Sequence, residues 1–114
     1  MLGGNGRGWD DAGTQKDMNS GSATSILVAA AIAGIGNGSA EGYCGEITLL
    51  NQTSAAFWTR VFFQGYFIDS QATPSGVWMA GGGAKETAQD TDAVQFLFSS
   101  GNISAGNYAC YGLA

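Results

Sequence analysis

The sequence contains no histidine, and this absence removes several classes of enzyme. Hydrolases of the Ser-His-Asp type use histidine as their general base, and catalytic zinc sites are commonly built on histidine ligands. We therefore exclude this type of hydrolysis and most zinc sites. The inventory predicts a protein that is not an enzyme and has no catalytic residue, no metal site and no cofactor.

Charged residues are also scarce, at 11% of the chain against about 25% in typical soluble domains. The nine acidic residues leave two alternatives open. A glycosidase needs two carboxylates roughly 5 to 10 Å apart, and Glu86, Asp90 and Asp92 offer oxygen ligands for calcium, although their spacing matches no EF-hand loop. Because these carboxylates lie in stretches typical of solvated turns, we interpret them as loop charge.

Basic residues are few, and long apolar runs are missing. The chain has four Lys and Arg residues, scattered along its length, and a net charge of -5. No basic stripe is available to neutralise phosphates or anionic lipids, which excludes nucleic-acid binding and binding to an anionic membrane surface. The longest apolar run, residues 26–33, is far shorter than the roughly 20 residues of a membrane span, so no membrane insertion is predicted.

The two cysteines, Cys44 and Cys110, are not spaced as a zinc or redox motif. We predict two buried thiols that act as small hydrophobes, and a disulfide between them is the alternative. Glycine is abundant, with 19 residues, and aromatic residues make up 11% of the chain. Enough apolar surface is therefore available for one core, and the low charge is typical of an uncharged polar surface or one buried against copies of the chain.

Two parts of the chain differ in pattern. Residues 1–25 are rich in Gly, Asn, Asp, Ser and Thr without sustained periodicity, and predict a loop or an extended N-terminal arm. Trp9 within it is interpreted as an anchor on the domain or on a neighbouring subunit, with sugar stacking as the alternative. Residues 26–114 are predicted to form one domain with glycine-rich loops.

Short segments with strand patterns recur in this domain, separated by Gly, Asn and Pro turns. They cover residues 26–33, 46–50, 57–69, 77–80, 96–98 and 108–113. Gly81 to Gly83 are expected to interrupt the fourth of these elements, and the last two are paired as a closing hairpin. Residues 57–69 are apolar on both faces, which predicts a central strand covered on both sides, and Gly65 indicates a bulge, a bend or close approach of another backbone. The spacing predicts an all-β fold, an antiparallel sandwich or jelly roll.

Six residues are candidates for contacts outside the domain. Arg60 within the long strand must find a partner if it is covered, and a subunit interface would supply one. The interface candidates are Trp9, Arg60, Phe62 and Tyr66, and the candidates for contact with a glycan are Trp78 and Tyr43.

The C-terminal run FLFSSGNISAGNYACYGL resembles the closing hairpin of a family of tailed-bacteriophage virion structural proteins, of the tail fibre or tail tip type. Upstream, GNGSAEGYCGEITLL is similar to the Gly-Asn and Gly-Glu-Ile segment of that family, and the stretch from Trp58 to Asp69 is similar to its long middle strand. The chain departs from the family in having Cys110 where an aliphatic residue is usual, and in having only 35 residues before Gly36.

This resemblance implies an oligomeric β-sandwich module, expected as a homotrimer, that is assembled in the host cytoplasm and is part of the virion. Its expected partners are copies of itself, other virion proteins and a glycan or protein of the host surface. A capsid decoration or head-fibre protein and a carbohydrate-binding module are the alternatives. A depolymerase is a further alternative, but the sequence favours a non-enzymatic module in virion structure and host attachment.

Overall fold

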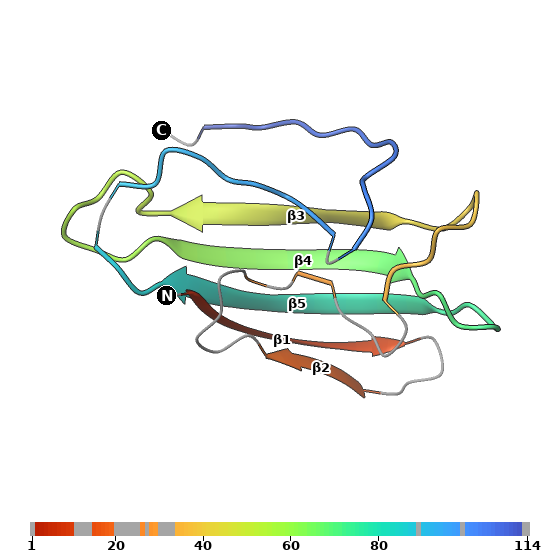
Figure 1. Cartoon of the computed structure of the whole chain (residues 1–114). Helices are drawn as coiled ribbons and strands as arrows, with labels where there is room; N and C mark the ends of the chain where they lie inside the picture. The colour runs from red at the N-terminus through yellow and green to blue at the C-terminus, as the bar shows by residue number, and fades with distance from the viewer. Residues whose placement is uncertain are drawn as a thin grey trace.

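A computed structural model describes residues 2–10, 15–19, 26, 28–29, 34–88, 90–98 and 100–112. This part of the chain is all-β, contains no helix, and forms one antiparallel sheet with the strand order β2-β1-β5-β4-β3 (Figure 1). The strands are β1 (Leu2–Asp10), β2 (Gln15–Asn19), β3 (Tyr43–Leu50), β4 (Arg60–Ile68) and β5 (Gly76–Lys85).

The all-β, antiparallel part of the fold prediction is confirmed. A sandwich or jelly roll requires a second sheet, and the described strands belong to one sheet, so the two-sheet arrangement stays a prediction. Among the described residues there is also no helix with the length and apolar character needed to cross a membrane.

The core lies on one face of the sheet, which we call the inner face. Side chains alternate between the two faces of a strand, and Phe63 and Phe67 of β4 and Val77 and Met79 of β5 are buried together there. Ile26, Val28, Ala29 and Ile35 pack against this cluster. Each large side chain removed from water contributes about 1.5 to 3 kcal/mol to stability.

Residues 1–25 were predicted to be a loop or an extended arm, and the loop is wrong for two segments, which form β1 and β2. The sheet is held here by the backbone ladder between β1 and β5, in which Gly6 lies opposite Gly81. A side chain on Gly8 would collide with the carbonyl oxygen of Trp78, so close approach of the two strands requires glycine at this position. β1 is stabilised by backbone hydrogen bonds and not by buried apolar side chains. Its sequence therefore lacks the apolar alternation by which a strand is recognised.

The same ladder corrects the prediction for β5. Gly81 to Gly83 do not interrupt the strand, because they pair with β1 on one side and β4 on the other. The strands predicted at residues 46–50 and 57–69 are confirmed as β3 and β4, although Phe57 and Trp58 precede the first residue of β4. β4 lies inside the sheet, between β3 and β5, but the described residues cover only one of its faces, which corrects the expectation of cover on both.

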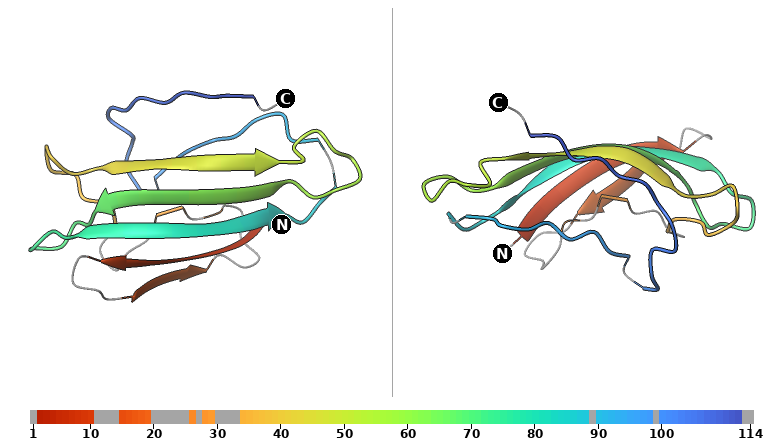
Figure 2. Two further views of the ribbon diagram at one scale, coloured as in Figure 1. Left: turned by 180° about the vertical axis from the view of Figure 1, so that it is seen from behind. Right: turned by 90° about the horizontal axis from the view of Figure 1, so that it is seen from above.

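The predicted closing hairpin is wrong for the described residues of the C-terminal segment, residues 93–112. None of these described residues belongs to a strand, and Figures 1 and 2 show the segment running outside the sheet beyond β3. Phe96, Phe98, Tyr108 and other large side chains are exposed. Aromatic residues favour a strand only where a neighbouring strand covers them, and the described sheet supplies none here. The turn glycine Gly101 does have a positive φ of 75°.

Residues 26–33 were expected to form a buried strand. Residues 26, 28 and 29 are not in a strand, and the rest of this segment lies outside the described residues. Ile26 and Val28 nevertheless reach the core, as their apolar character indicated.

The β4–β5 connection is a hairpin loop, and it is organised by Asp69. This side chain is fully buried, and its carboxylate accepts hydrogen bonds from the backbone N–H of Ser75 at 3.0 Å and from Nε2 of Gln71 at 2.5 Å. The Asp69 N–H in turn donates to the carbonyl oxygen of Ser75 at 3.0 Å. A buried carboxylate is tolerated here because the loop supplies its hydrogen-bond donors.

Candidate functional site: the outer face of the sheet

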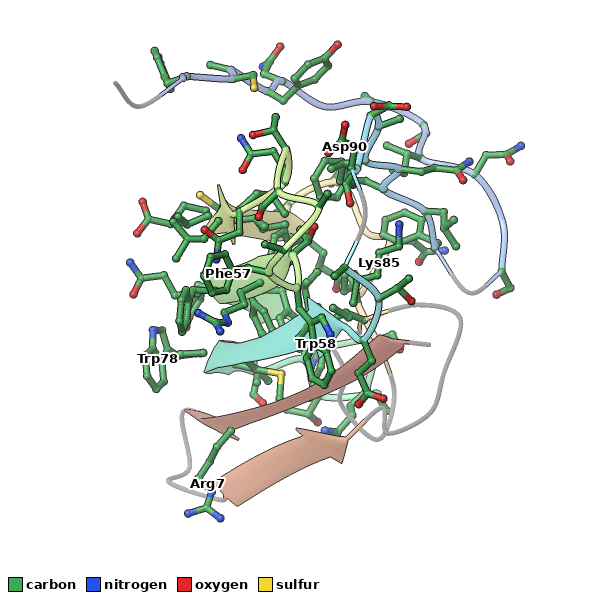
Figure 3. The ribbon with its side chains drawn as sticks, turned by 90° about the vertical axis from the view of Figure 1, so that its left-hand side faces the viewer. Arg7, Phe57, Trp58, Trp78, Lys85 and Asp90 are labelled. Carbon is green, nitrogen blue, oxygen red and sulfur yellow. The ribbon has the colours of Figure 1, made fainter. Side chains whose placement is uncertain are left out.

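Among the described side chains, three aromatic ones are exposed on the outer face of the sheet, opposite the core. Because Phe63 and Phe67 of β4 point inward, the strand period places Phe62 and Tyr66 outward. Phe62 is 55% exposed, Tyr66 45% and Trp78 of β5 41%. We call these three residues the aromatic platform. In Figure 3, Trp78 and Arg7 project from the same side of the sheet.

The strand register brings part of the platform into a row across the sheet. Tyr66 is directly opposite Trp78 in the β4–β5 ladder, and Cys44 is opposite Tyr66 in the β3–β4 ladder. Trp9 occupies the position opposite Trp78 in the β1–β5 ladder. Four strands therefore contribute to one row.

A polar row lies between this aromatic row and Phe62. Glu46, Gln64 and Ala80 are opposite one another in successive ladders, and Nε2 of Gln64 donates a hydrogen bond to Oε1 of Glu46. This pair contributes to a shallow open pocket of about 300 Å³, which is lined by Glu46, Thr48, Phe62, Phe63, Gln64, Ala80 and Gly81. The face thus combines exposed rings with an amide and a carboxylate held in a fixed relation.

Glycine shapes the pocket beside Phe62. Phe62 is opposite Gly82 in the β4–β5 ladder, and a Cβ built on Gly82 would lie 3.3 Å from the Phe62 ring. The ring therefore extends over the glycine. A larger residue at this position would push Phe62 away from the sheet and change the wall of the pocket.

The structure brings most of the predicted contact residues together. The interface candidates Arg60, Phe62 and Tyr66 share the outer face with the glycan candidate Trp78, so the two predicted roles belong to one surface. Arg60 is exposed at one end of this face, so its charge needs no buried partner. For Trp9, the structure gives the position in the ladder.

Tyr43 is separated from the other candidates, because it lies on the inner face. Its side chain is half-buried, and its ring centroid is 6.4 Å from that of Phe67. The ring covers Gly65, where a Cβ would collide with it. The ladder is continuous at Gly65, so no bulge forms, and the backbone of Gly45 on β3 approaches Gly65 closely, which is one of the alternatives expected for this glycine. Burial raises the pKa of the Tyr43 hydroxyl, and the neighbouring Cys44 thiol raises it further.

The structure corrects the prediction for the two cysteines and adds residues to the site. Cys44 and Cys110 are free and exposed, not buried thiols, and Cys44 stands beside Tyr66 on the outer face. Gln64 and Thr48 were not identified as site residues, because strand alternation gives their face but only the register shows that they meet Glu46 and Phe62. Glu86, Asp90 and Asp92 are exposed, in keeping with loop charge.

Comparison with known proteins adds no relative: no protein-family model matches the chain, and neither the curated proteins nor the solved structures contain a match.

Proposed function

We propose that the chain is a non-enzymatic structural and adhesion module of a tailed-phage virion, of the tail fibre or tail tip type, and that the outer face is its contact surface. The observation that carries the proposal is the aromatic platform, three large rings exposed on one face of a sheet whose other face packs the core. Large aromatic side chains gathered and exposed on one face of a folded protein are typical of an interaction site.

The composition of the platform supports this role. Tyr, Trp and Phe are enriched in the buried centres of protein interfaces, because each buries a large area and loses little conformational freedom. A β-sheet holds these rings in fixed relative positions, which reduces the entropy that binding must overcome. The resemblance of the C-terminal run to virion structural proteins supplies the biological setting of the proposal.

The C-terminal segment supports self-association as part of the same role. It contains no charged residue between Ala93 and Gly112. It exposes the large apolar residues Val94, Phe96, Leu97, Phe98, Ile103, Tyr108 and Tyr111. Burial of these side chains against further copies would remove a large apolar area from water, and a homotrimer is the assembly that we propose.

The test combines solution mass with one matched pair of variants. Light scattering coupled to size exclusion should give a mass near three times the 11.6 kDa of the chain. Phe62→Ser on the outer face should weaken assembly or adsorption to host cells, whereas Phe57→Ser should not, because Phe57 is equally exposed but precedes β4 (Figure 3). A monomeric chain in which Phe62→Ser and Phe57→Ser both leave adsorption unchanged would refute the proposal.

A further inference from the structure

The centre of the outer face differs from that of a typical protein interface. Charged residues are depleted at the core of protein–protein interfaces, yet the lining of the pocket here includes Glu46 and its hydrogen-bonded partner Gln64. An amide and a carboxylate between exposed rings match a different kind of ligand, one that presents hydroxyl groups and apolar C–H faces together.

We infer that the outer face binds a neutral polysaccharide, with sugar rings stacked on the aromatic platform and sugar hydroxyls bonded to Gln64 and Glu46. This inference rests on the proposed adhesion function and names the class of ligand for the same face. The ligand is a chain of sugars, because the strand rise places Phe62 and Tyr66 about 13 Å apart along β4 with Gln64 between them.

The hydrogen-bonding capacity of the pocket supports this ligand. Gln64 Nε2 donates to Glu46 Oε1, which leaves the amide oxygen of Gln64 and the second carboxylate oxygen of Glu46 as acceptors for hydroxyl donors. The Thr48 hydroxyl in the pocket wall can donate or accept. Because the Gln64–Glu46 pair spans two paired strands, these groups are held in position before the ligand arrives.

The charge of the pocket lining favours an uncharged chain. Glu46 is the charged residue of that lining, and the arginines of the same face, Arg7 and Arg60, lie outside it. An anionic polysaccharide would bring like charge to the Glu46 carboxylate, which is unfavourable. A neutral polysaccharide meets no such repulsion and can use the carboxylate as a hydrogen-bond acceptor.

The experiment is affinity electrophoresis of the full chain in gels that contain a soluble neutral polysaccharide (mannan, galactomannan, dextran or a mixed-linkage β-glucan) or the anionic alginate. At least one neutral polymer should retard the protein, and alginate should not. Trp78→Ala should reduce the affinity for that neutral polymer about tenfold or more, because it removes a stacking ring. Glu46→Gln, which keeps the shape of the side chain, should retain binding better than Glu46→Ala.

Trp58→Ala is the matched control. Trp58 is 48% exposed, similar to Trp78, but it precedes β4, roughly 25 Å along the chain from Tyr66. Its removal should leave retardation unchanged. Thermal melting of each variant by circular dichroism should match that of the wild type, so that a loss of binding is not a loss of fold.

Several outcomes would overturn the inference: no neutral polymer retards the chain, alginate alone does, or Trp58→Ala and Trp78→Ala reduce binding equally. If no polymer binds while Phe62→Ser dissociates the trimer, the outer face is a protein interface, and the proposed function survives without the inference. If a neutral polymer binds a monomeric chain through Trp78, the inference stands and the assembly part of the proposed function fails.

Discussion

At the scale of single residues, Asp69 links the stability of the protein to pH. The hydrogen bond from the Ser75 backbone N–H is the main reason that the pKa of Asp69 is lowered, with further contributions from Gln71 and the Ser75 hydroxyl, and burial acts in the opposite direction. A carboxylate with a lowered pKa in the folded state contributes stability above its unfolded pKa, about 3.9, and this contribution is lost as the pH falls through the folded pKa.

We therefore expect the melting temperature to fall as the pH drops below about 4. Asp69→Asn should lower the melting temperature at pH 7 and flatten its dependence on acid, because an amide cannot reproduce the charged acceptor. Glu86→Gln, which alters an exposed loop carboxylate, is the control and should keep the wild-type pH profile. Melting curves measured from pH 7 to pH 2 provide the comparison, and equal acid sensitivity in the two variants would contradict the role given to Asp69.

Tyr43 leads to the second prediction, because its buried hydroxyl has no hydrogen-bond partner among the described residues. A buried polar group without a partner costs about 1 to 3 kcal/mol. Tyr43→Phe removes the hydroxyl and keeps the ring that covers Gly65, so we expect unchanged stability or a gain of about 1 kcal/mol. Tyr43→Ala, which also removes the ring, should be destabilising. Urea denaturation of both variants tests this, and a clear loss of stability in Tyr43→Phe would show that the hydroxyl is bonded.

At the scale of elements, β4 supplies two adjacent residues of the same type on opposite faces of the sheet. Phe63 is 4% exposed in the core, and Phe62 is 55% exposed on the outer face. Phe63→Ala should cost about 3 to 5 kcal/mol, because it leaves a cavity. Phe62→Ala should cost less than about 1 kcal/mol. The free energies of unfolding from denaturant titration decide the matter, and similar losses in the two variants would mean that the outer face is covered.

Alternation of side chains explains which elements could be predicted from the sequence. In β3, Ile47 and Leu49 alternate with Glu46 and Thr48, and the predicted strand is present. β1 and the glycine-rich half of β5 were missed because their stability comes from ladder hydrogen bonds, which depend on neighbours that the local sequence does not identify. The C-terminal segment has strand-forming residues, but local propensity cannot supply a partner strand.

The candidate site, too, was predictable only where the alternation of side chains along one strand was sufficient. Arg60, Phe62, Tyr66 and Trp78 were selected as exposed or interfacial residues, and strand alternation was enough to place the first three on one face. Their combination with Trp78, and the pocket formed by Glu46 and Gln64, depend on the register between strands. Register belongs to a pair of strands, and the sequence of one strand alone does not determine it.

At the scale of the whole molecule, the sheet and the C-terminal segment should be separable. A chain shortened after Asp92 retains all five strands, together with the hydrogen bond from the Thr91 N–H to the Gln52 carbonyl oxygen. We expect it to keep its circular dichroism spectrum and to melt within a few degrees of the full chain, because the removed residues contribute no strand. We also expect its solution mass to fall toward that of a monomer, since the exposed apolar residues of the segment are gone.

Light scattering and thermal melting of the shortened chain, beside the full chain, test both parts. Unfolding of the shortened chain would mean that residues 93–114 cover the core. An unchanged oligomeric mass would locate self-association entirely on the sheet. Either result would remove the segment from the proposed assembly surface.

The pairing of β1 with β5 has a consequence for the order in which the protein folds during translation. Leu2 lies opposite Lys85, a separation of 83 positions along the chain (85 minus 2). At about 5 to 20 residues per second, the ribosome needs on the order of 4 to 16 seconds to synthesise that stretch, and during this time β1 has no β5 to join. β3, β4 and β5 follow one another and can pair as they emerge, so the N-terminal strands are the last to enter the sheet. β1 and β2, which can pair with each other, are thus the strands that wait longest to join the rest of the sheet.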